Sequence, residues 1–151
     1  MATSTDEFIG TLNDLIETCK DGEQGYRDGA EGMTDPQISE LFLKYAQQRA
    51  EYARELQSHV SKLGKMPETS GSAAGAIHRG WLNIKAAVTG KDTKSVVDEA
   101  ERGEDIAVDT YQKALAKDLP SDLKAVVERQ YIGVQEAHDK VRTLKHSMHK
   151  S

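Results

Sequence analysis

Residues 93–115 read TKSVVDEAERGEDIAVDTYQKAL. Their apolar residues recur every three or four positions, which is the period of an α-helix with one buried face. Pro120 follows and limits the helix, because the residue before a proline disfavours helical backbone. The predicted buried face comprises Val97, Ala100, Glu104, Ala107 with Val108, Tyr111 and Leu115. The stretch therefore predicts a long amphipathic helix with one carboxylate, that of Glu104, on its packing side.

The same period continues in the C-terminal part of the chain. Ser121 and Asp122 are favourable residues at a helix start. The stripe behind them consists of Leu123, Val127, Tyr131, Val134, His138 and Val141. We expect a final helix that frays from Lys145 onward, where apolar spacing gives way to a basic tail.

The N-terminal part of the chain predicts a second helix pair. Thr34-Asp35-Pro36 is a helix-start signal, because Thr or Asp caps free amides and Pro suits the first turn. Gly64 is the expected stop for the helix that begins there. Before this signal, residues 6–32 also have helical spacing, with glycines on or near the stripe. They are Gly22, Gly25, Gly29 and Gly32, and their clustering indicates either close backbone approach or a frayed second half of the helix.

A long connection separates the two pairs. Residues 64–71, GKMPETSG, are dense in turn formers and predict a loop. Helical spacing then resumes at Ala73 with Ala74, Ile77, Trp81, Ile84 with Lys85, and Val88. We expect a short helix that ends at Thr89-Gly90 and lies across the bundle, anchored by Trp81.

The predicted fold is an all-α single domain over residues 1–151. It consists of a hairpin over 6–63, a crossover over 64–91 and a hairpin over 92–146. A four-helix bundle with one long crossover is typical of ferritin-like folds, and an ordinary five-helix bundle is the alternative.

Composition limits the classes of function. The 151 residues are 37% hydrophobic and 30% charged, with a formal net charge of -5 and no compensating basic run, so nucleic acid is not an expected partner. No apolar stretch reaches the length of a membrane span, so no membrane partner is expected. Cys19 is the single cysteine, and an acidic N-terminus follows Met1 where a secretory signal would be basic, so a cytoplasmic location is expected.

Four polar residues fall on the apolar stripes, one in each long helix. They are Glu23, Arg49, Glu104 and His138. A buried charge is costly unless it is paired, neutralised or bound to metal, so a shared polar layer inside the bundle is predicted. The dipeptide Gly-Glu occurs at 22–23 and again at 103–104, which indicates either duplicated hairpins or chance similarity.

Several motifs resemble known families. Residues 103–107, GEDIA, followed by Tyr111, resemble the Gly-Glu helix segment of rubrerythrins, and residues 135–138, QEAH, resemble a degraded Glu-x-x-His motif. The runs SGSAAGAIHRGWLNIKAAVTGKD, EAERGEDIAVDTYQKAL and QEAHDKVRTL resemble an uncharacterised bacterial family of ferritin-like bundles, a domain of unknown function. The resemblance to this bacterial family implies a ferritin-like fold and a stress-related role.

The rubrerythrin resemblance also implies a pair of iron or manganese ions. Such a site needs one Glu from each of two helices and Glu-x-x-His from the other two. Glu23 and Glu104 match the lone glutamates and His138 matches one histidine, with Glu101 or Glu136 as further ligands. Gln135 replaces a bridging carboxylate, and the second helix has no histidine in register.

Arg49 favours a different use of these residues. A guanidinium on the inner stripe would repel metal ions but could bridge Glu23 and Glu104 with charge-assisted hydrogen bonds. We therefore predict a salt-bridge network of Glu23, Arg49 and Glu104, completed by Gln135 and His138, in a non-catalytic homodimer without cofactor. The alternative is a di-iron or di-manganese binding protein or oxidoreductase of rubrerythrin type.

Overall fold

The structure is a computed structural model, and it describes residues 5–64, 81, 84–90 and 92–149. This part of the chain contains five helices and no strand. They are α1 (Thr5–Glu31), α2 (Pro36–Lys62), α4 (Ile84–Thr89), α5 (Thr93–Leu115) and α6 (Ser121–His149).

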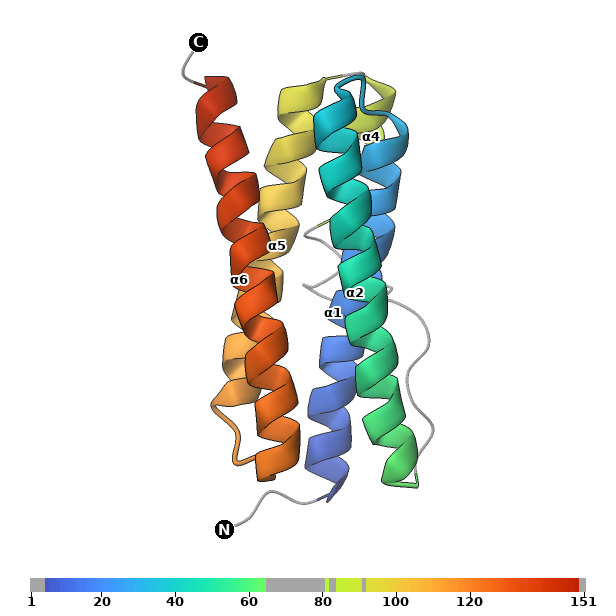
Figure 1. Cartoon of the computed structure of the whole chain (residues 1–151), viewed down its shortest axis with the longest axis vertical. Helices are drawn as coiled ribbons and strands as arrows, with labels where there is room; N and C mark the ends of the chain where they lie inside the picture. The colour runs from blue at the N-terminus through green and yellow to red at the C-terminus, as the bar shows by residue number, and fades with distance from the viewer. Residues whose placement is uncertain (1–4, 65–80, 82–83, 91, 150–151) are drawn as a thin grey trace.

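Figure 1 shows the four long helices side by side as two antiparallel pairs, α1 with α2 and α5 with α6. The pairs meet mainly where α1 packs on α5, and α4 contacts both of these helices at one end of the bundle. The all-α fold with two hairpins and a short extra helix in the crossover is thus confirmed.

The helix ends follow the local signals in the sequence. Asp35 caps α2, because its carboxylate accepts from the backbone N–H groups of Gln37 (2.9 Å) and Ile38 (3.3 Å), while Pro36 occupies the first turn. Gly64 follows α2 with φ of 79°, a left-handed conformation that favours glycine.

The last helix is longer than predicted, because α6 continues through Lys145 to His149. Two contacts explain the extension. Lys145 Nζ lies 2.8 Å from Glu101 Oε1 on α5, and Met148 packs against the apolar core. The basic end of the chain is therefore held on the bundle as far as α6 extends.

Glycines let the crossover enter the bundle. Trp81 is buried, and its indole lies against both Gly25 of α1 and Gly103 of α5, so closely that a Cβ atom at either position would overlap the ring. Close approach, one of the two expected reasons for the α1 glycines, is therefore observed, and α1 stays helical to Glu31. Residues 65–80, with the predicted loop and the start of the predicted short helix, lie outside the described residues.

The core consists of two apolar clusters stacked along the bundle. On every long helix the members of one cluster occupy one end and those of the other cluster the opposite end. The first cluster includes Leu12, Leu15, Cys19, Ala53, Leu56, Ala107, Tyr111, Val127 and Val134. The second includes Tyr26, Phe42, Tyr45, Ala46, Trp81, Ala100, Ala137 and Val141. Arg49 and Glu104 lie at the level where the two clusters meet.

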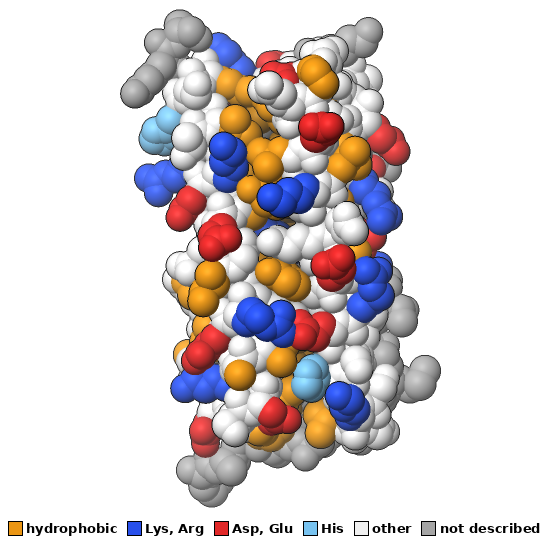
Figure 2. Space-filling model, viewed as in Figure 1, with side chains coloured by type: hydrophobic (Ala, Val, Ile, Leu, Met, Phe, Trp, Pro, Cys, Tyr) orange, Lys and Arg blue, Asp and Glu red, His pale blue; other side chains and the backbone are white. Residues whose placement is uncertain are grey.

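The outer surface is strongly charged. On the face that Figure 2 shows, side chains of both signs cover the helices, and hydrophobic side chains gather along the seam between α2 and α6. At one end of that seam a cleft is lined in part by Ile38, Leu41, Leu144 and Met148. Among the described residues, no helix is long and apolar enough to cross a membrane.

Candidate functional site: a buried arginine and glutamate pair

Arg49 of α2 and Glu104 of α5 form an ion pair in the middle of the bundle. The distances are 2.5 Å from Nη1 to Oε1 and 2.6 Å from Nη2 to Oε2, so the guanidinium donates to both carboxylate oxygens. The exposed fraction is 1% for Arg49 and 0% for Glu104. A bidentate pair of this kind is among the strongest hydrogen-bonded arrangements available to side chains.

The rest of the guanidinium is enclosed by neighbouring groups. Arg49 Nε donates to Gln48 Oε1 (3.2 Å), and Arg49 Cζ lies 5.7 Å from the centroid of the Tyr26 ring, which is a cation–π contact. A Cβ atom at Gly22 would come within 3.2 Å of Nη1, so α1 leaves room for the arginine. Residues of α1 and α2 thus enclose the Arg49 guanidinium inside the bundle.

Electrostatics keep the arginine charged. Burial alone would lower the pKa of Arg49, but the Glu104 carboxylate raises it above its ordinary value through its charge and its hydrogen bonds. The interior of the bundle therefore contains a permanent positive charge.

Tyr26 covers the pair from the side of the second cluster. Its ring contacts Phe42, Tyr45 and Trp81 at centroid distances of 5.1, 5.5 and 4.9 Å. Burial and the nearby Glu104 carboxylate hold the pKa of Tyr26 well above its usual value. Its hydroxyl has no well-aligned hydrogen-bond partner among the described residues. Tyr26 is thus a neutral phenol in an aromatic cluster.

A series of hydrogen-bonded polar groups, separate from the ion pair, runs from the core to the surface. The Cys19 thiol lies 3.2 Å from the Tyr111 hydroxyl, which donates to Gln130 Oε1 (2.8 Å). Gln130 Nε2 donates to Glu55 Oε1 (2.8 Å), and Glu55 pairs with Arg129. Burial raises the pKa of Cys19 to about 11, so it is a protonated thiol rather than a nucleophile.

The structure places the other predicted network residues elsewhere. Glu23 is buried, but its carboxylate pairs with Lys20 (3.0 Å) and Arg27 (2.9 Å) on its own helix. Gln135 is exposed, and its amide donates to the Tyr131 hydroxyl (3.0 Å). Of the five predicted residues, the described contacts join Arg49 with Glu104 and leave Glu23, Gln135 and His138 in other surroundings.

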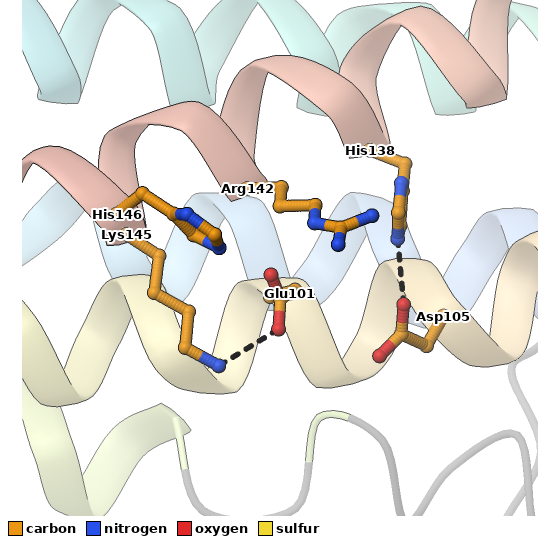
Figure 3. Close-up of a pocket in the computed structure, with 6 residues that line it drawn as sticks. All are labelled: Glu101, Asp105, His138, Arg142, Lys145 and His146. Atoms are coloured by element: carbon orange, nitrogen blue, oxygen red, sulfur yellow. Dashed lines mark hydrogen bonds and ion pairs between the residues drawn. The ribbon is translucent and has the colours of Figure 1, made fainter.

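For Gln135 and His138 the reason is the rotation of α6. Its inward positions are Gln130, Val134, Ala137 and Val141, so residues 135 and 138 each lie one position further around the helix. His138 therefore lies between α5 and α6, where Nε2 is 2.6 Å from Asp105 Oδ1 (Figure 3). Its Nδ1 is 3.2 Å from Asp139 Oδ1.

We expect His138 to make stability depend on pH. Burial lowers its pKa, but the hydrogen bonds to Asp105 and Asp139 outweigh that effect and raise the folded-state pKa above the unfolded value of about 6.5. The stabilisation is therefore full below about pH 6.5 and is lost as the pH rises through the folded-state pKa. Urea unfolding from pH 5 to 9 gives the free energy of unfolding of the wild type and of His138→Gln. The difference between the two values should decrease as the pH rises. If this difference in unfolding free energy does not change with pH, His138 is not the group responsible. Asp105→Asn should reduce the dependence of stability on pH.

Comparison with known proteins places the chain in a family. Residues 7–117 match the family model described as "Domain of unknown function (DUF2383)". The chain belongs to the DUF2383 family. No curated protein matches it.

A solved structure shows which fold this DUF2383 protein adopts. A mutant of Dps1 from Mycobacterium smegmatis superposes with a TM-score of 0.73 at 13% sequence identity, over 95% of this chain and 99% of that chain. At this identity the similarity establishes the fold alone. The DUF2383 protein is therefore a ferritin-like four-helix bundle, as predicted.

The interior of this DUF2383 protein does not fit the di-metal centre that the sequence resemblance implies. Arg49 already occupies both oxygens of Glu104, and its charge would oppose a metal ion. Of the two further predicted ligands, Glu101 pairs with Lys145 and Glu136 is exposed. Within the described ranges, no group of three or more His, Cys, Asp or Glu side chains is arranged to bind a metal ion.

Proposed function

We propose that this DUF2383 protein is a non-catalytic ferritin-like bundle protein in which an ion pair takes the place of a di-metal site. The observation that supports this proposal best is the bidentate pair of Arg49 and Glu104, which is almost completely buried between the two apolar clusters. An arginine at this position supplies internally the positive charge that a metal would supply to Glu104.

The proposal gives Glu104 a role that does not require a metal. An unpaired carboxylate in this interior would cost several kcal/mol, of the order of 3 to 5. The guanidinium compensates that charge with two hydrogen bonds in a fixed geometry, and Gly22 leaves the space that the guanidinium needs. The same residues therefore have a complete structural role that requires no redox chemistry.

The proposed biological setting follows in part from the resemblance described above, which implies the stress-related role, and in part from the composition and the apolar stripes of the chain. It comprises a stress-related role, a cytoplasmic location and a homodimer with neither nucleic acid nor membrane as partner. Large apolar side chains remain at the surface, at Leu43 (51% exposed) and Ile132 (56% exposed), and are available to an interface between two copies.

Metal analysis tests the absence of a di-metal site. The full chain should be expressed with added iron and manganese and purified without chelator. We expect much less than one iron or manganese per chain, because Arg49 occupies Glu104. Element analysis by mass spectrometry gives the ratio of metal to protein.

Two variants locate any metal that is found. Glu104→Ala removes the buried carboxylate, and Glu128→Ala removes an exposed carboxylate of α6 as a control. One or more iron or manganese ions per wild-type chain, kept in Glu128→Ala and lost in Glu104→Ala, would refute the proposal. That outcome would favour the rubrerythrin-type metal protein. If Glu104→Ala does not fold, the metal content of the wild type still decides the question.

A further inference from the structure

A polar groove of about 330 Å³ runs between α5 and α6, away from the buried pair. Six ionisable side chains line it, as Figure 3 shows. The two carboxylates come from α5 and the four basic side chains from α6. They are Glu101 and Asp105, and His138, Arg142, Lys145 and His146. The groove thus has an acidic wall and a basic wall.

Both carboxylates of the groove are already engaged. Glu101 Oε1 lies 2.8 Å from Lys145 Nζ, and Asp105 Oδ1 lies 2.6 Å from His138 Nε2. Each of these ion pairs links α5 to α6. The acidic wall is therefore neutralised by two of the four basic side chains.

Arg142 lies between these two ion pairs. It is four residues after His138 and three before Lys145, so all three side chains share one face of α6. Figure 3 shows the Arg142 side chain along the groove, between the Lys145–Glu101 and His138–Asp105 pairs. Among the residues that the structure describes, no carboxylate forms an ion pair with Arg142. His146 follows one turn later and lines the same groove.

We propose that this groove binds a small phosphate-like oxyanion, with Arg142 as its principal ligand and His146 and Lys145 beside it. The planar guanidinium presents two parallel N–H groups, the geometry that matches two oxygens of a phosphate. This binding site is separate from the Arg49–Glu104 pair and does not depend on the proposed function.

The size of the groove indicates which phosphates fit. Ligand pockets begin at about 300 Å³, so this groove suits a free phosphate ion or a small phosphomonoester rather than a large cofactor. The chain has a formal net charge of -5, so overall charge does not attract anions. Binding must therefore come from the local arrangement around Arg142.

NMR titration of the full chain tests the proposal. Inorganic phosphate and methyl phosphate are added separately at constant ionic strength, while backbone amides and arginine Nε–H signals are recorded. We expect saturable shifts of the Arg142 Nε–H signal and of amides over residues 138–146. Tighter binding of methyl phosphate would identify the ligand class as a phosphomonoester, whereas tighter binding of inorganic phosphate would identify the free ion. Shifts that stay linear with phosphate concentration, or that spread over all helices, would overturn the proposal.

Charge-matched variants separate this groove from general charge effects. Arg142→Gln should weaken binding about tenfold or more, because a charge-assisted hydrogen bond is lost. Arg54→Gln makes the same change at an exposed arginine of α2 outside the groove and should leave binding unchanged. Equal weakening in both variants would overturn the proposal. Circular dichroism checks that each variant is folded.

A third variant tests the engaged carboxylate. Glu101→Gln removes one negative charge from the groove and releases Lys145 from its ion pair. We expect phosphate to bind several-fold more tightly to this variant, because a second cation becomes available to the ligand. Unchanged or weaker binding would show that Arg142 and Lys145 do not share a ligand, contrary to the proposal.

Discussion

Replacing Arg49 by leucine is expected to lower the free energy of unfolding by about 3 to 5 kcal/mol, because Glu104 is left charged and unpaired in the core. Glu104 has no exposed surface, so water cannot replace the lost guanidinium without opening the bundle. Urea unfolding at neutral pH, followed by circular dichroism, measures the loss. An exposed arginine provides the control, and Arg54→Leu should change stability by no more than about 0.5 kcal/mol.

The double variant Arg49→Leu with Glu104→Leu is expected to recover most of the lost stability. A buried ion pair is often no more stabilising than well-packed apolar residues of similar volume, whereas half of such a pair is strongly destabilising. Two results would contradict the described geometry: a cost below about 1 kcal/mol for Arg49→Leu, or a double variant as unstable as the single one.

Replacing Gly103 by alanine is expected to displace Trp81 and to lower stability by about 1 to 3 kcal/mol, the usual cost of overpacking. The added Cβ atom would overlap the indole, which already fills the space between α5 and Gly25 of α1. Alanine also favours the helix by up to about 1 kcal/mol, so the clash must exceed that gain. Trp81 is the single tryptophan, and its fluorescence emission should shift to longer wavelength as it gains contact with water.

Gly10 provides the matched control for Gly103. It also lies inside a long helix, but a Cβ atom there would meet no heavy atom within 4 Å. Gly10→Ala should therefore raise stability by up to about 1 kcal/mol and leave Trp81 emission unchanged. If Gly103→Ala behaves like Gly10→Ala in both measurements, Trp81 does not lie between α1 and α5.

Much of the fold could be predicted because it depends on local signals. The Thr34-Asp35-Pro36 signal and Gly64 mark the two ends of α2, and the 3.6-residue period predicts the long helices and most of their buried positions. Close approach was one of the two reasons expected for the glycines at 22, 25, 29 and 32, and each of them lies against a side chain of the crossover or of α2. The far end of α6 could not be predicted, because a contact with Glu101, distant in sequence, stabilises it.

The polar interior was predictable only in part. A stripe of 3.6-residue period does not determine which of two adjacent positions faces the centre, since they differ by about 100° around the helix. The stripe predicted for α6 runs through Tyr131 and His138, whereas the inward positions are Gln130 and Ala137. Gln130 lies three residues after Val127 and four before Val134, so the helical spacing of the sequence is consistent with an inward position for Gln130. Glu55 could not be found in this way, because its role depends on contacts with another helix.

The position of the buried pair restricts how the two hairpins align. Arg49 belongs to the first hairpin and Glu104 to the second, and each loses its solvent only when the hairpins come together. A slip of one helical turn, about 5.4 Å, would bury both charges against apolar side chains instead of each other. The pair thus makes a single longitudinal register the favourable one for this bundle.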